Sequence, residues 1–436
     1  MSSGPFRIIE HIIPGQHIRE FPRATATEQE EIFRLAVKQY VPIDNPNPQP
    51  GDLTIIGAHA NGFPKELYEP LWEEIHARSK RHGFRIRSIW IADVAHQGQS
   101  GVLNENALGN DPSWMDHPRD LMHLINLKRA EMPRPLIGIG HSMGGNNLVN
   151  VALMHPRLFT SLILLDPVIY PPDESMNGKV PITTLSSTHR RDLWPSRQAA
   201  AESLKKNKFY QKWDPRVLNR WIKYGLRDVP TALFPDIEAA RKAAGSGPSE
   251  TPVTLTTTRH QEVFTFNRPN YEGAPDKVPV NRKTHPDLDR STGGWPYYRA
   301  EVPRTFMNLP YVRPSVLYLF AELSDMSAEP ARNDKLKYTG VGVGGSGGAA
   351  EGRVKGHLLK DVGHLIAMEA VDESADVVSE WIGSELQRWR TEEAEFRVEW
   401  SKKSKVDKMT IDANWVKHVP VPARRAAKHS GSKSKL

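Results

Sequence analysis

The chain has 436 residues, of which 38% are hydrophobic and 25% charged, and this is the composition of a globular protein that can bury a large core. It has no cysteine, which excludes disulfide bonds, thiolate zinc sites and a cysteine nucleophile, and no apolar run approaches the roughly 20 residues that span a bilayer. The net charge is +7, but residues 401–436 hold ten Lys or Arg against two Asp, so the rest of the chain is nearly neutral and no nucleic-acid-binding face is expected.

Two segments near the start of the chain are typical of β-strands. Residues 6–13 and 32–40 are rich in large apolar side chains and suit an antiparallel pair that opens a sheet. Apolar strands and amphipathic helices then alternate, with strands predicted at 52–58, 84–93, 135–141 and 159–166 and helices at 65–80 and 115–132. This alternation predicts an α/β fold in which helices cover both faces of a mostly parallel sheet.

A short motif links the strand at 135–141 to the helix that follows it. The motif is Gly140-His141-Ser142-Met143-Gly144. A serine in a sharp turn between strand and helix is the nucleophile elbow of α/β-hydrolases, where only small residues fit two positions before and after the serine. The turn aims the helix N-terminus at the hydroxyl, so an oxyanion formed there would meet free N–H groups. The alternative is a glycine-rich turn with an incidental serine, but the flanking strand and helix favour a nucleophile.

The strand–helix alternation stops at Pro171-Pro172 and resumes with strands at 315–320 and 354–362. Between them, Trp194, Trp213 and Trp221 lie in contexts typical of helices. An insertion between the sixth and seventh strands is where α/β-hydrolases carry a lid that excludes water, and an unrelated packing domain is the alternative. The predicted organisation is a hydrolase core at 1–170 and 313–400, a lid at 171–312 and a basic tail at 401–436.

Three further features follow in the last third of the chain. Gly340–Gly348 resembles a phosphate-binding loop, but it lacks the Lys-Ser/Thr pair of that motif and opens no helix, so we expect a surface loop. Residues 370–400 predict a long amphipathic helix that caps the sheet or supplies a homodimer contact. The tail ends in Ser434-Lys435-Leu436, a tripeptide read by the peroxisomal import receptor, and this predicts a peroxisomal enzyme.

A nucleophilic serine needs a histidine base and a carboxylate that orients the histidine. Among the 17 histidines, His364 follows the last predicted strand and precedes a helix, which is where this fold places its catalytic histidine. His357, inside that strand, is the alternative. Asp166 after the sixth strand and Asp325 after the seventh both lie at the edge where parallel strands end, and position alone does not choose between them.

The oxyanion hole needs two N–H donors. The backbone amide of Met143, directly after the serine, is the first candidate. The second is expected from the loop at 59–63, with the Asn61 amide preferred and that of Ala60 next. We expect His59 and His141 to brace the structure rather than to take part in the chemistry.

Longer stretches around these motifs carry a resemblance to a known family. They lie at 64–72, 113–117, 132–145, 155–167, 251–257 and 344–348. With the terminal tripeptide they resemble the fungal peroxisomal α/β-hydrolases of secondary-metabolite and toxin biosynthesis, the family of mycophenolic acyl-CoA and AK-toxin hydrolases, over nearly the whole chain. The resemblance implies a thioesterase or ester hydrolase without a cofactor, and it implies the triad Ser142, Asp166 and His364, which favours Asp166. Met143 and the pair Asn146-Asn147 depart from the family pattern, so the acyl preference stays open.

The expected reaction is hydrolysis of an acyl-CoA thioester through an acyl-serine intermediate. One alternative keeps this chemistry but takes a lipid or polyketide oxyester or a lactone, because one triad serves all of these substrates. The other is a binding protein on a hydrolase scaffold, against which the intact Ser142 and His364 argue. Cations in the predicted lid are candidates for holding CoA phosphates, namely Arg190, Arg191, Lys205 and Lys206.

Overall fold

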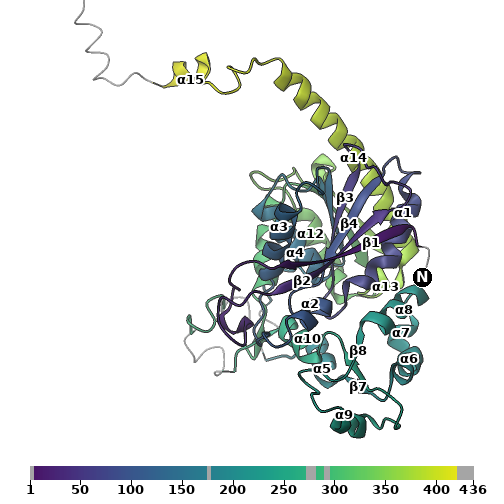
Figure 1. The fold of residues 1–436 in the computed structure, drawn as a ribbon. Coiled ribbons are helices and arrows are strands. Elements are labelled where there is room, and N and C mark those ends of the chain that lie inside the picture. Colours follow the sequence, from purple (N-terminus) through teal and green to yellow (C-terminus); the bar gives the residue numbers. More distant parts are fainter. Residues whose placement is uncertain (1–3, 174–177, 272–280, 289–294, 420–436) are drawn as a thin grey trace, which may run out of the picture. The chain divides into compact units, whose positions relative to one another are not determined.

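The computed structural model describes residues 4–173, 178–271, 281–288 and 295–419. In this part of the chain the main sheet has eight strands in the order β1-β2-β4-β3-β5-β6-β12-β13 (Figure 1). They are β1 (Phe6–Pro14), β2 (Arg34–Pro42), β3 (Leu53–Ala58), β4 (Ile86–Ala92), β5 (Leu136–His141), β6 (Ser161–Leu165), β12 (Ser315–Ala321) and β13 (Val354–Leu359). β2 pairs antiparallel with β1 and β4, and the other neighbours are parallel, which confirms the predicted fold class.

The helices that flank this sheet bury two separate hydrophobic cores. They are α1 (Glu69–Ser79), α2 (Gly98–Leu103), α3 (Asp116–Leu127), α4 (Met143–Met154), α12 (Glu329–Tyr338), α13 (Ile366–Glu369) and α14 (Val371–Ser401). Successive side chains of a strand point to opposite faces, so Ile55 packs with α1 and the beginning of α14, whereas Ile56 packs with α3 and α4. Strands such as β3 and β6 are buried on both faces, as expected for parallel strands at the centre of a sheet.

The residues between β6 and β12, here called the insertion, form a separate group of helices and short strands. The helices are α5 (Ile182–His189), α6 (Arg197–Lys206), α7 (Lys208–Gln211), α8 (Pro215–Tyr224), α9 (Ile237–Ala244), α10 (Arg259–Phe266) and α11 (Glu301–Asn308). The strands are β7 (Leu193–Trp194), β8 (Leu226–Asp228), β9 (Val253–Leu255), β10 (Arg268–Pro269) and β11 (Tyr297–Tyr298). In Figure 1 most of these elements gather on one side of the main sheet.

Two of the three tryptophans expected in helices lie elsewhere. Trp221 is in α8, but Trp213 follows α7 in a turn and Trp194 belongs to β7. Trp194 pairs with Val253 of β9, so its extended backbone is set by a partner about 60 residues away, which local sequence does not reveal.

The chain forms two units, residues 1–386 and residues 387–436. The second unit contains the end of α14 and α15 (Ala413–His418). Among the described residues, no helix combines the length and the apolar character needed to cross a membrane. The tripeptide Ser434-Lys435-Leu436 lies outside the described residues.

Candidate active site

Ser142 sits in a strained turn between β5 and α4. Its backbone has φ 56° and ψ −116°, a combination that residues with a side chain rarely adopt. A Cβ on Gly140 would lie 2.5 Å from the Gly144 carbonyl oxygen, and a Cβ on Gly144 would lie 2.1 Å from the Ala58 carbonyl oxygen. Both glycines are therefore required by close backbone contacts, as the motif predicts.

Three of the candidate residues form one chain of hydrogen bonds. His364 Nε2 lies 2.8 Å from Ser142 Oγ, and His364 Nδ1 lies 2.6 Å from Asp166 Oδ2. Asp166 follows β6 and is 1% exposed, Ser142 is 6% exposed, and the His364 side chain is 32% exposed on the loop after β13. The structure thus brings Ser142, His364 and Asp166 together, whereas Asp325 is exposed and His357 remains within β13.

The loop after β12 surrounds the Asp166 carboxylate with hydroxyl groups. Ser324 Oγ donates to Asp166 Oδ2 over 2.5 Å, and Ser327 Oγ donates to Asp166 Oδ1. Burial by itself raises the pKa of this carboxyl, but hydrogen bonds from His364, Ser324 and Ser327 outweigh burial and hold the pKa below its usual range. Sequence reasoning missed both serines, and their only signal was a place beside Asp325 at the end of the seventh strand.

The loop at 59–63, here called the β3 loop, lies against the start of α4. The Ala60 amide donates to Tyr68 Oη and the Gly62 amide donates to Gln97 Oε1, each over 2.8 Å. Among the described residues no acceptor contacts the Asn61 amide between them, and the Met143 amide is at the free N-terminus of α4. Of the two amides expected from this loop, only that of Asn61 is therefore available to a ligand.

His59 and His141 both lie in the core as neutral braces. His59 Nε2 accepts from the Val94 amide over 2.9 Å, and burial lowers the pKa of His59. His141 Nδ1 lies 2.9 Å from Tyr68 Oη, and His141 Nε2 lies 2.9 Å from the His364 carbonyl oxygen. Burial, together with the neighbouring His364, lowers the pKa of His141 to about 3, so the His141 imidazole is neutral at neutral pH.

The insertion reaches the β3 loop through α10. The Asn61 amide side chain donates to the Glu262 carbonyl oxygen over 3.0 Å, and Gln97 Nε2 joins Asn61 Oδ1 to Thr265 Oγ1. The Glu262 carboxylate accepts hydrogen bonds from Arg190 and from Ser187. Of the cations expected to hold CoA phosphates, Arg190 is thus engaged with a buried carboxylate. The Arg191 guanidinium lies over the Trp194 ring, while Lys205 and Lys206 are exposed.

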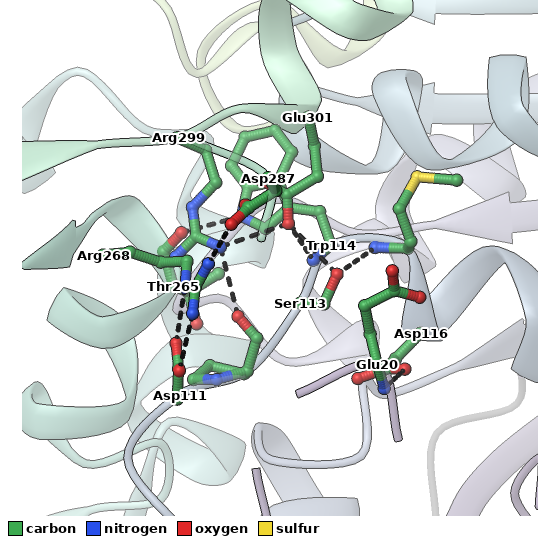
Figure 2. Close-up of polar contacts among 12 residues, drawn as sticks. Glu20, Asp111, Ser113, Trp114, Asp116, Thr265, Arg268, Asp287, Arg299 and Glu301 are labelled. Carbon is green, nitrogen blue, oxygen red and sulfur yellow. Dashed lines mark hydrogen bonds and ion pairs between the residues drawn. The ribbon is translucent and has the colours of Figure 1, made fainter. Parts of the chain in front are cut away.

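Buried ion pairs connect the insertion to the segment before α3 (Figure 2). Arg268 makes a double hydrogen bond to Asp111 over 2.7 and 2.8 Å. The Glu301 carboxylate accepts from the Trp114 amide over 3.0 Å and from Arg299 over 3.3 Å. These contacts hold the Trp114 ring in a small apolar cluster beside the elbow, which consists of Val94, Trp114, Met143 and Val302.

A cavity of about 600 Å³ opens between the core and the insertion. It is lined by Arg23, Arg227, His96, Gln261 and Phe264 among others, and the side chains of Ser142, Asp166 and His364 do not line it. Within the described residues, no group of three His, Asp or Glu side chains is arranged to bind a metal ion.

Comparison with known proteins places the chain in a family. It is 42% identical to type I acyl-CoA thioesterase mpaH of Penicillium roqueforti over the full length of both chains, and 41% identical to mpaH' of Penicillium brevicompactum over 99% of this chain and all of that one. The chain belongs to the mpaH family. It is also 28% identical to the abhydrolase domain-containing protein AKT2 of Alternaria alternata over 58% of this chain and 84% of that protein.

Broader comparisons concern a wider hydrolase family and the fold. The serine aminopeptidase S33 family model matches residues 77–221, a range that includes Ser142 and Asp166. The fold is similar to the peroxisomal α/β-hydrolase Lpx1 of Saccharomyces cerevisiae, with TM-score 0.65, 15% identity and 99% of both chains covered. It is also similar to the thioesterase domain of the curacin biosynthetic pathway, with TM-score 0.50, 13% identity, and 85% of this chain and 99% of that one covered. This member of the mpaH family is therefore a hydrolase with the α/β-hydrolase fold.

Proposed function

We propose that this protein hydrolyses acyl-CoA thioesters with Ser142 as nucleophile, His364 as general base and Asp166 as the carboxylate that orients His364. The observation that carries the proposal is the continuous hydrogen-bond chain from Ser142 Oγ through both ring nitrogens of His364 to Asp166. In such an arrangement the histidine removes the serine proton as the hydroxyl attacks, and the carboxylate keeps the imidazole in the required tautomer.

The reaction proceeds in two halves. His364 takes the proton of Ser142 while Oγ attacks the thioester carbonyl, and the resulting oxyanion accepts hydrogen bonds from the Met143 and Asn61 amides. Collapse of this intermediate breaks the carbon–sulfur bond, and the sulfur of CoA leaves with the proton from His364. Water, deprotonated by His364, then attacks the acyl-serine and releases the carboxylic acid and Ser142.

We propose a thioester and not an oxyester as the substrate, because relatives that match along the whole chain are named type I acyl-CoA thioesterases. An oxyester or lactone substrate would use the same three residues, so a direct comparison is required. The kcat/KM for an acyl-CoA should exceed that for the oxyester with the same acyl group, and a preference for the oxyester would contradict the proposed substrate.

The decisive experiment measures free thiol released from a panel of acyl-CoA esters. The chain has no cysteine, so a thiol-reactive dye detects only the released CoA. Wild type should turn over at least one thioester, Ser142→Ala should turn over none, and Ser186→Ala, at an exposed serine of α5, should match wild type. Full turnover by Ser142→Ala would show that Ser142 is not the nucleophile.

Two finer proposals concern the insertion and the location of the enzyme. Residues 171–312 would act as a lid that shapes the substrate site between core segments 1–170 and 313–400, because α10 contacts the β3 loop. Ser434-Lys435-Leu436 would direct the protein to the peroxisomal matrix through the import receptor. A fluorescent fusion at the N-terminus should lose its peroxisomal pattern when these three residues are deleted, and an unchanged pattern would contradict the proposal.

A further inference from the structure

Lys335 is a buried lysine that the proposed mechanism does not use. It lies on α12 and is 1% exposed. Lysine is almost never fully buried unless its ammonium group interacts with partners that compensate for lost hydration. Its Nζ donates to the Met326 carbonyl oxygen over 2.9 Å.

Met326 belongs to the short helix η6 (Asp325–Ser327), the segment that holds Asp166. Ser324, directly before η6, and Ser327, at its end, both donate their hydroxyls to the Asp166 carboxylate. A second cation of α12, Arg332, donates to the Ser327 carbonyl oxygen over 2.6 Å. The two cations of α12 therefore bind backbone carbonyls of η6, and the serine hydroxyls beside these carbonyls bind the Asp166 carboxylate.

Lys335 and Asp166 also interact through their charges. Burial lowers the pKa of Lys335 to about 8, while the negative charges of Asp166 and Asp334 act in the opposite direction and favour the ammonium. An attraction between two charges is mutual, so the ammonium favours the ionised form of Asp166. It also disfavours a second positive charge on His364, which shares the Asp166 carboxylate.

We propose that Lys335 is a positioning residue of the triad, whose buried ammonium fixes η6 behind Asp166 and extends the activity of His364 as a base to lower pH. The inference rests on the proposed roles of Ser142, His364 and Asp166. The geometry explains how Asp166 is held although it lies after the sixth strand and its hydroxyl partners come from the loop after the seventh.

The charged and titratable groups that face this region come from several elements. They are His141 and His364 at the elbow and the β13 loop, Arg332 and Asp334 on α12, and Glu322 and Asp325 on the loop after β12. Lys335 itself has a pKa near 8, because burial lowers it from the usual value of a lysine.

The test is the pH dependence of two reactions that do not require CoA, namely the hydrolysis of a p-nitrophenyl ester and the labelling of Ser142 by a fluorophosphonate. Lys335→Met removes the charge at similar volume, and Lys337→Met removes an exposed charge from the same helix as a matched control. The acid limb of kcat/KM in Lys335→Met should shift upward by roughly half a unit to one unit, as expected for the loss of a positive charge that interacts with the carboxylate shared by His364. The Lys337→Met profile should match wild type.

Lys335→Arg provides an independent readout. Its guanidinium keeps a positive charge at every pH of the assay, so Lys335→Arg should keep the acid limb of wild type, and an acid limb shifted upward in this variant would contradict the inference. This variant also carries the test if Lys335→Met fails to fold.

A Lys335→Met profile lowered by the same factor at every pH would assign Lys335 a structural role only and overturn the inference. An unchanged profile would do the same. If Ser142→Ala kept its activity toward the ester, the proposed triad would fail instead, so the two failures are distinguishable.

Discussion

Tyr68 Oη lies 2.9 Å from His141 Nδ1, and this contact connects the β3 loop to the loop that carries His364. Burial raises the pKa of Tyr68, so its hydroxyl keeps its proton and donates to the neutral His141. Tyr68 Oη also accepts from the Ala60 amide in the β3 loop, and His141 Nε2 donates to the His364 carbonyl. One relay of hydrogen bonds therefore links the proposed oxyanion site to the proposed base.

Tyr68→Phe tests this relay. The substitution removes one hydroxyl and leaves the ring, so the β3 loop and the His364 loop lose their common partner. We expect kcat to fall about 10-fold, equivalent to ~1.4 kcal/mol of transition-state stabilisation, with little change in KM.

Tyr318→Phe is the matched control for Tyr68→Phe. Tyr318 is equally buried, and its hydroxyl bonds to Thr339 away from the triad. Its loss should cost about 1 kcal/mol of folding free energy by urea unfolding and leave kcat unchanged. An equal fall of kcat in both variants would mean that the effect is global.

Asp166→Asn and Asp325→Asn separate the two carboxylates that sequence position leaves equivalent. Asp166→Asn should lower kcat by about 10³- to 10⁴-fold, because an amide favours the wrong tautomer of the histidine. Asp325→Asn should remain within about twofold of wild type, since the Asp325 side chain is exposed and makes none of the hydrogen bonds to Asp166. The opposite ranking in a steady-state assay would assign the acid to Asp325.

The raised pKa of Asp116 predicts that the free energy of unfolding depends on pH. Burial raises the pKa of this carboxyl to about 7, although Arg19 and the Glu20 amide favour the ionised form. Because the folded pKa exceeds the unfolded value of about 4, the folded state binds more protons and its stability falls as pH rises between about 4 and 7. Asp116→Asn should remove this loss, so its unfolding free energy should change less than that of wild type between pH 5 and pH 8.

Urea unfolding at those two pH values provides the measurement for Asp116, with exposed Asp325→Asn as the control that should follow wild type. Asp116 and Glu20 are drawn in Figure 2. Equal pH dependence in Asp116→Asn and wild type would show that Asp116 titrates normally.

Substitution of Arg190 tests whether this cation has a structural role or binds a phosphate of CoA. Its guanidinium bonds to the Glu262 carboxylate, which lies against Gly62 of the β3 loop. Arg190→Gln should therefore lower kcat/KM on a thioester and on the matched oxyester by the same factor, because the loop is disturbed for both. Arg191→Gln, which removes a cation beside an aromatic ring, should have a small effect on either substrate. A rise in KM confined to acyl-CoA would show instead that Arg190 holds a phosphate.

The elements that carry the site follow from local sequence. Gly140 and Gly144 flank Ser142 because the turn admits no Cβ at either position, and a requirement of this kind is visible in five consecutive residues. The place of His364 after the last strand and the alternation of strands and helices are equally local, since each depends on periodicity within 10 to 20 residues or so. The prediction that Trp194 lies in a helix was wrong because a distant strand, β9, sets its extended backbone.

The surroundings of the proposed triad were decided by tertiary structure. Asp166 and Asp325 occupy equivalent places at the ends of two parallel strands, and only the folded chain shows that Asp166 reaches His364 Nδ1. Ser324, Ser327 and Lys335 lie far from Asp166 in the sequence, and no spacing rule connects them. The sequence by itself determined which chemical groups are present and which turn carries the serine. Which carboxylate contacts His364, and what supports that carboxylate, depended on which side chains the packing of β6, β12 and α12 brings within hydrogen-bonding distance. Such contacts are set by three-dimensional distance and not by separation along the chain.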